Sequence, residues 1–250
     1  MNYGIKDAAN VVLQKISDGK PFIKSEYANV TTNEWSSAQT YAMAKGSRAI
    51  RWDHAKESTL VMDMEVFELK WLAVVAGKDW VTGATDIFKN EVLYASETNT
   101  ITIAETPTTG SLSVFKLESD LVTHGEEQVA GAPVTETNEY SIDAKVITLN
   151  ETTAPEGTAF VVYYAYESGA GAQQLTFTAN DFPEAFEVIA DTYIRPKGGG
   201  VDEFVQIHYL NARPMPNFTL TMDASNAANL SITFDLLPDA KGNIATYTVI

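Results

Sequence analysis

The chain has 250 residues, of which 45% are hydrophobic and 20% charged, and its formal net charge is -16. These proportions are ordinary for a folded protein, with enough chain for one large β domain or two smaller ones. The acidity disfavours nucleic acid as a bound ligand, because phosphate contacts need Lys and Arg. The absence of cysteine excludes disulfides, zinc–thiolate sites and cysteine nucleophiles.

The first fifty residues contain short signals of mixed type. We expect a short helix over residues 8–16, extended chain over residues 22–30 and a polar loop over residues 31–37. Strand-like sequence returns around Tyr41 and over residues 49–52.

The next segment changes its period. Residues 58–65 alternate, with Leu60, Met62 and Met64 on one side, which predicts a strand. Apolar residues then fall at helical spacing, so we predict one helix over residues 67–76 that stops at Gly77 and flanks a sheet. A strand over residues 87–94 follows.

Residues 105–168 form a predicted unit of their own. Strands are expected around residues 112–115, 146–149 and 160–166, with turn residues at short intervals, the pattern of a small β-sandwich. The segment carries eleven acidic residues against two lysines, a net charge of -9. We interpret it as a sandwich inserted between the two halves of a larger β domain, residues 1–104 and 169–250.

Residues 173–238 predict a succession of strands of period two, each with one buried and one wet face. The strands begin at Leu175, and the glycine run at residues 198–200 predicts a long hairpin over residues 186–209. The predicted fold class is therefore mainly β.

No catalytic fingerprint is present. Hydrolase elbows, phosphate-binding loops, dinucleotide glycine motifs and zincin helices are absent from the sequence. His54 is expected in a tight polar turn and His208 on a strand face, and with His124 they give no spacing typical of a metal site. Asp63 and Glu65 could work as an acid–base pair on sugars, but plain strand alternation explains their spacing.

Several aromatic residues could form a carbohydrate platform, although core or interface packing explains most of them: Trp35, Trp80, Tyr163, Tyr164 and Tyr166. We therefore expect no enzyme, and no catalytic, cofactor-binding or metal site. Neither a signal peptide nor a membrane span is visible in the sequence, so we expect no contact with a membrane.

Two groups of segments carry a resemblance to a known family. The first comprises Tyr41-Ala42-Met43-Ala44, Arg51-Trp52-Asp53, Ser58-Thr59-Leu60 and the helix ending at Gly77. The second comprises Asn211-Ala212-Arg213-Pro214, Phe218-Thr219-Leu220-Thr221 and Leu230-Ser231-Ile232-Thr233-Phe234-Asp235. In this order they resemble the two halves of phage major tail tube proteins, best over residues 20–95 and 173–250.

The resemblance implies a tail-tube-type β-sandwich or barrel whose hexameric rings stack into a hollow virion tail tube. DNA would pass through it without specific binding during ejection. Candidate partners are other copies of the chain and the tail sheath, baseplate and tape measure proteins, with assembly in the host cytoplasm. The segment at residues 105–168 departs from the smallest members and looks like an added immunoglobulin-like module.

Two other interpretations remain open. One is a receptor- or sugar-binding β-sandwich protein on a virion surface. The other is a different virion structural protein, such as a capsid or decoration subunit.

Overall fold

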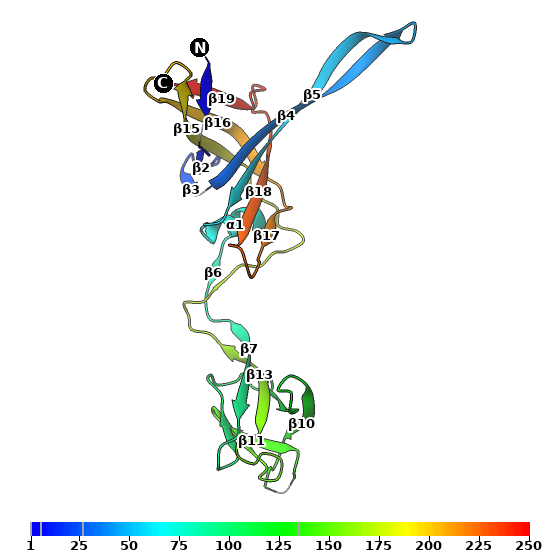
Figure 1. The fold of residues 1–250 in the computed structure, drawn as a ribbon, viewed down its shortest axis with the longest axis vertical. Coiled ribbons are helices and arrows are strands. Elements are labelled where there is room, and N and C mark those ends of the chain that lie inside the picture. Colours follow the sequence, from blue (N-terminus) through cyan, green and yellow to red (C-terminus); the bar gives the residue numbers. More distant parts are fainter. Residues whose placement is uncertain (1, 6, 27, 135) are drawn as a thin grey trace. The chain divides into compact units, whose positions relative to one another are not determined.

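The computed structural model describes residues 2–5, 7–26, 28–134 and 136–250. Within these residues the chain is mainly β, with α1 (Lys70–Ala76) as its helix. The fold separates into two units, Met1–Trp80 with Leu175–Ile250, and Val81–Gln174 (Figure 1).

The first unit is built on one large antiparallel sheet. Its main path runs in the order β3-β2-β15-β16-β18-β5-β4, while β1 pairs with β15, β17 with β18 and β19 with β16. The strands are β1 (Tyr3–Ile5), β2 (Asn10–Lys15), β3 (Pro21–Ser25), β4 (Ala28–Ala44), β5 (Ser47–Met64), β15 (Phe186–Pro196), β16 (Glu203–Pro214), β17 (Thr219–Thr221), β18 (Asn229–Leu236) and β19 (Ala245–Val249).

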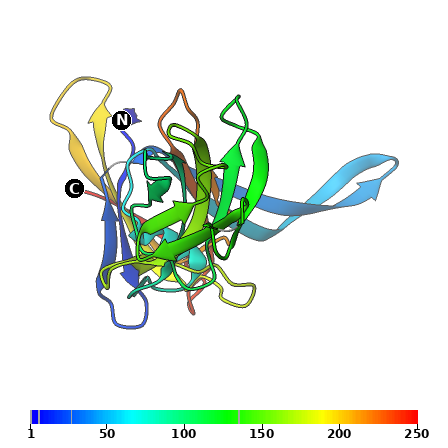
Figure 2. The same ribbon diagram turned by 90° about the horizontal axis from the view of Figure 1, so that it is seen from below.

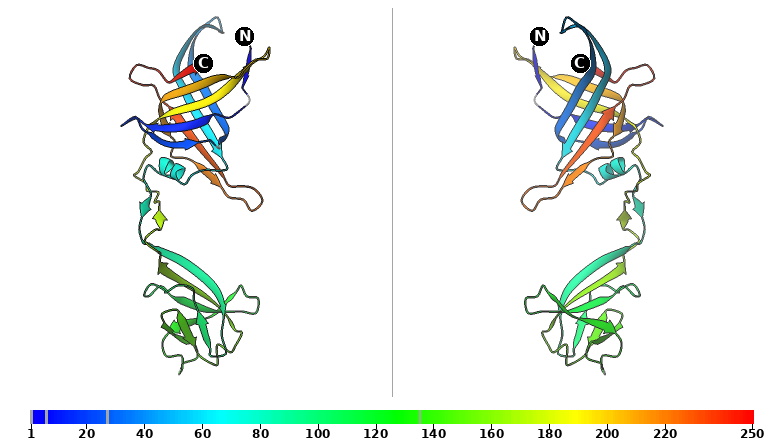
Figure 3. Two further views of the ribbon diagram at one scale, coloured as in Figure 1. Left: turned by 90° about the vertical axis from the view of Figure 1, so that its left-hand side faces the viewer. Right: turned by 90° about the vertical axis from the view of Figure 1, so that its right-hand side faces the viewer.

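The sheet curls until its two ends approach each other (Figure 3). The hydroxyl of Ser25, in β3, donates to the sulfur of Met64, in β5, at 3.4 Å. The backbone N–H of Ala9 donates to the Thr31 hydroxyl, in β4, at 3.2 Å. The result is a nearly closed, barrel-like sheet.

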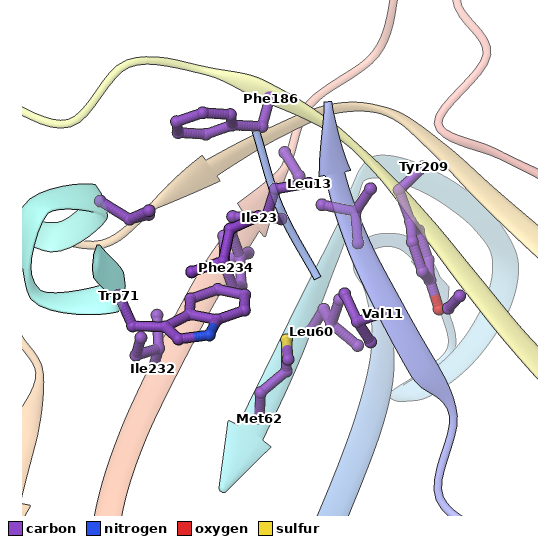
Figure 4. Packing of buried hydrophobic residues seen from close by; sticks show 14 of the residues in the cluster. Val11, Leu13, Ile23, Leu60, Met62, Trp71, Phe186, Tyr209, Ile232 and Phe234 are labelled. Carbon is purple, nitrogen blue, oxygen red and sulfur yellow. The ribbon is translucent and has the colours of Figure 1, made fainter. Parts of the chain in front are cut away.

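Strand alternation fills the interior of this barrel. Every second residue of β18, and of β5 from Ser58 to Met64, points inward, and Met62, Ile232 and Phe234 have no exposed surface. The ring of Trp71 enters the same core from α1, which covers part of the barrel (Figure 4). The strand predicted over residues 58–65 is confirmed as far as Met64, and the alternation of residues 230–236 is confirmed as β18.

The helix is shorter than the sequence predicts. Phe67 packs against the core but precedes the first helical turn, so the helix comprises Lys70–Ala76 rather than residues 67–76. Its predicted stop is confirmed, because Gly77 adopts a left-handed conformation (φ 66°) and its N–H donates to the carbonyl of Ala73.

Three other predictions in this unit are wrong. Residues 8–16 are not a helix: Asn10–Lys15 is β2, which sends Val11 and Leu13 into the core and pairs with β15. Residues 31–37 are not a loop but part of β4. The segment 175–179 forms no strand.

The second unit is a seven-stranded sheet that folds over on itself. Strand β10 pairs with β9 on one side and, in parallel, with β11 on the other, so two layers face each other across one core that includes Ile147 and Phe160. The strands are β7 (Asp86–Tyr94), β8 (Thr100–Thr102), β9 (Ser113–Leu117), β10 (His124–Ala130), β11 (Glu139–Asp143), β12 (Val146–Leu149) and β13 (Ala159–Glu167), in the order β7-β13-β9-β10-β11-β12-β8. A small separate ladder joins β6 (Val81–Thr82) to β14 (Gln173–Gln174).

The boundaries of this unit correct the sequence-based division at residues 105–168. Strands β7 and β8 belong to the smaller unit, because β7 pairs along its full length with β13 and β8 pairs with β12. The unit therefore runs over Val81–Gln174, and residues 81–104 and 169–174 move to it from the larger domain.

Candidate assembly surfaces

A two-stranded arm leaves the barrel where β18 stops covering β5. Strand β18 pairs with β5 only as far as Thr59, whereas β4 and β5 continue as a hairpin. We call residues 34–57 the arm; in two views at right angles it extends away from the barrel (Figures 1 and 2). Its residues are exposed except for Tyr41 and Ala42, which are half-buried. Both faces and both edges of the arm are thus open to solvent.

The conformation of the arm is set by its turn and its bulges. Lys45 and Gly46 both have positive φ, 50° and 84°, as a two-residue hairpin turn with the twist of the strands requires. The register shifts between Ser37 and Ala38, beside Ala55, which also has positive φ (49°). Such bulges bend a ribbon and increase its twist.

Large apolar side chains lie on the arm without any covering element. Met43 is 62% exposed, Ile50 54% and Trp52 52%. Ile50 and Trp52 are two residues apart in β5, and the register does not shift between their cross-strand partners, Ala42 and Thr40. The two side chains therefore lie on the same face of the arm. A two-stranded ribbon is at best marginally stable alone in water, and exposed apolar side chains grouped on one mark an interaction site.

Residues 31–37 are polar, so the sequence does not predict a strand at the start of the arm. A strand with two wet faces carries little apolar alternation, so its periodicity resembles that of a loop. The one local signal was the Lys45-Gly46 pair between two extended runs.

The predicted hairpin of residues 186–209 is confirmed as β15 and β16. It is not a free arm over its whole length, because β15 also pairs with β2 and β1, and β16 with β18 and β19. Near the tip, Arg195 pairs with Gly4 of β1, and its Nε and Nη2 donate to the Asp202 carboxylate at 2.5 and 2.7 Å.

The outer face of the barrel strands is polar and carries carboxylates. Asp63, Glu187, Asp191 and Asp235 alternate with buried neighbours and are half-buried themselves. Gln206 Nε2 donates to Asp191 at 3.0 Å, and His208 Nε2 lies 3.1 Å from Glu187. Cations on this face are fewer and include Lys24 and Arg213, the latter opposite Asp235.

The three histidines are not brought together into a site. His208 lies on a strand face, as predicted, whereas His54 belongs to β5 in the arm and not to a tight turn. His124 stacks on Phe115 in the smaller unit. Over the described ranges, no cluster of three or more His, Asp or Glu side chains is placed to hold a metal ion.

The acidic pair and the five aromatic residues also separate. Asp63 is on the outer face of β5, while Glu65 lies past the end of that strand. Tyr164 is fully buried and donates to Glu91 at 2.6 Å; burial first, and then this carboxylate, raise the pKa of its phenol. Trp35 is an arm residue, and the Trp80 indole donates to the carbonyl of Leu69 at 3.1 Å.

In the part of the chain that the structure describes, no helix has both the length and the apolar character needed to span a membrane.

Comparison with known proteins gives one family. The family model described as YomU/Tube protein family matches residues 3–250, which indicates a phage tube-like structural protein. No curated protein matches the sequence. The match spans both units and includes the barrel, the arm and the smaller sheet. The chain therefore belongs to the YomU/Tube protein family.

Proposed function

We propose that the protein is the major subunit of a phage tail tube, which assembles as stacked hexameric rings around a bore through which DNA is ejected. The observation that carries the proposal is the arm, residues 34–57. It is a long, exposed β ribbon, and among the residues that the structure describes no third strand pairs with it.

The geometry of the arm supports contact with another copy. Within the described residues, Ile50 is 54% exposed and Trp52 52%, so we infer that a neighbouring copy covers them. A protruding element that docks on a different surface of an identical neighbour makes a heterologous contact. Repeating such contacts closes a ring or builds a filament, which is the geometry of a tube.

The outer face of the barrel supports a role in lining the bore. Its hydroxyls and carboxylates, such as Thr233 and Asp235, give a wet surface with few cations. Repeated in every copy, this surface would repel DNA phosphates and let the duplex move without sticking. In this function the chain performs no reaction and needs no cofactor, and its partners are other copies and the remaining tail proteins.

Negative-stain electron microscopy of the purified chain tests the proposal. We expect rings or tubes whose end-on class averages have sixfold symmetry. A protein that stays monomeric at every concentration and salt condition tried would contradict it, as would particles of another symmetry.

An arm truncation tests the structural basis. Replacing residues 38–55 with Asn-Gly keeps the Ser37–Lys56 pair and closes the ribbon with a favourable two-residue turn. We expect a folded protein that no longer forms rings. Rings of wild-type appearance from this variant would show that the arm is not the assembly element.

A further inference from the structure

One face of the smaller unit is apolar although it faces solvent. In β13, Phe160, Val162 and Tyr164 point into the core, so Val161 and Tyr163 point outward. Cross-strand pairing places Val92 opposite Val161, and Phe115 on its other side. An outer sheet face normally carries polar residues, so this composition needs an explanation.

Aromatic side chains on this face surround the buried side chain of Val161. Val161 is 4% exposed and lies beneath partly buried Phe115 and Tyr163. Phe88 is 70% exposed, and its ring stacks on that of Tyr163, with centroids 6.1 Å apart and planes at 17°. His124 stacks on Phe115 with centroids 5.0 Å apart. We call this group, Phe88, Phe115, His124, Val161 and Tyr163, the aromatic platform.

Hydrogen-bonding groups lie among the rings. The Tyr163 hydroxyl and His124 Nε2 are 2.9 Å apart, and Asn90 is directly opposite Tyr163 on β7. Ligand sites in proteins combine apolar and aromatic surface with a few placed polar groups. The aromatic platform has both the aromatic surface and the polar groups next to each other on the same sheet face.

The charge around the platform restricts what can bind. The unit Val81–Gln174 has three lysines against fourteen acidic residues, a formal net charge of -11. Strands β7, β9, β10 and β13 contain two lysines, Lys89 and Lys116. Both lie on the opposite face of the sheet, because their cross-strand partners are the core residues Tyr164 and Phe160. The charged residues that share the platform's face are acidic: Asp86, Glu127 and Glu167.

We propose that the aromatic platform binds a neutral polysaccharide. The C–H faces of a sugar ring are weakly positive and pack on the negative faces of aromatic rings, here Phe88 and Tyr163. Sugar hydroxyls can exchange hydrogen bonds with Asn90, Tyr163 and the bordering carboxylates. An anionic glycan or a second copy of this -11 unit would meet like charge, which a neutral glycan does not. This binding site is separate from the tube function and does not depend on it.

A glycan array probed with the labelled full-length protein tests the proposal. The array carries neutral oligosaccharides, including glucans, galactans and mannans, and anionic uronates. We expect binding to at least one neutral class, competed by the free oligosaccharide. Binding to no neutral glycan, or to uronates alone, overturns the proposal.

Amino-acid substitutions test whether the glycan binds at the aromatic platform. Phe88→Ala removes an exposed ring, and we expect affinity for the bound glycan to fall about tenfold or more with an unchanged melting temperature. Tyr163→Phe keeps the ring but removes the hydroxyl, and should weaken binding less. The matched control is Tyr193→Ala, an exposed ring (57%) in the other unit, which should bind as wild type. Undiminished binding by Phe88→Ala overturns the proposal, and so does self-association of the wild type that Phe88→Ala abolishes.

Discussion

The hydroxyl of Tyr247, in β19, donates a hydrogen bond to the side-chain oxygen of Asn33, in β4, at 2.9 Å. The amide nitrogen of Asn33 in turn donates to the Ser58 hydroxyl at 3.0 Å and to the carbonyl of Thr59 at 2.9 Å. Asn33 thus joins the last strand of the chain to both strands of the arm at the point where the arm leaves the barrel.

We predict that Asn33→Ala destabilises β4 and β5 at the point where the arm leaves the barrel. The change leaves Tyr247 and Ser58 without this partner and should lower the free energy of unfolding by about 1–3 kcal/mol. Hydrogen exchange should accelerate in β4 and β5 near Thr59 and leave β12 and β13 unchanged. Gln39→Ala is the control, because its contact with Tyr41 is exposed and within the arm; equal exchange in both variants would contradict the prediction.

The apolar face of the arm should matter for assembly and not for folding. Trp52 is 52% exposed, so Trp52→Ser should leave the melting temperature within a few degrees of wild type. Sedimentation should show a shift from assembled to free subunits. Gln39→Ser, a polar position in the same ribbon, should assemble normally, and assembly of the Trp52 variant at wild-type concentration would speak against this contact.

Gly77 should tolerate no side chain. Its left-handed conformation disfavours any residue with a Cβ, and a Cβ there would collide with the backbone carbonyl of Phe182. Gly77→Ala should therefore cost about 2–4 kcal/mol in chemical unfolding, above the cost of about 1–2 kcal/mol for the backbone conformation alone. Gly157→Ala is the control: φ is also positive (82°) but the space is open, so only the smaller cost is expected.

Alkaline pH should destabilise the barrel through Tyr209. Burial raises the pKa of this phenol far above its ordinary value of 10.0, with a smaller contribution from Tyr247. The unfolded chain can ionise this phenol above pH 10 while the folded chain cannot, so stability is full below pH 10 and falls as pH rises further. Tyr209→Phe should flatten the decline measured by urea unfolding above about pH 10, whereas Tyr193→Phe, at an exposed ring, should not.

The boundaries of the smaller unit predict different results for two deletions. Removing residues 81–174 with a short linker takes out a complete core, so the barrel should remain folded and soluble. Removing residues 105–168 leaves β7 and β8 without β13 and β12, and exposes Ile101 and Leu93. We expect that second product to aggregate; equal solubility of both products would contradict the division.

The sequence predicts the parts of this fold in which one face is buried. Leu230, Ile232 and Phe234 alternate because the barrel has a dry interior, and Gly77 marks a helix end because few other residues adopt its conformation. The errors have different causes. Asn10–Lys15 is too short for its period to separate helix from strand, and only pairing with β15 decides it.

The sequence predicts the arm and the aromatic platform only in part. The arm lacks a buried face, so no apolar period marked residues 34–40 as strand. The sequence offers Tyr163 as a candidate aromatic residue, but its stacking with Phe88 depends on the register of β7 against β13, which a single sequence does not contain. The family match supports the tube interpretation, while ring symmetry and DNA passage remain predictions.

The short ladder between β6 and β14 brings the two ends of the smaller unit together. Gln173 pairs with Thr82, and the N–H of Gly83 donates to the carbonyl of Ala172 at 2.9 Å. A cargo domain whose own termini adjoin could therefore be grafted in place of residues 83–172 without stretching the chain on either side. On a polymer of this subunit, such grafts would recur at every repeat, which makes the position a natural choice for displaying enzymes or antigens in a regular array.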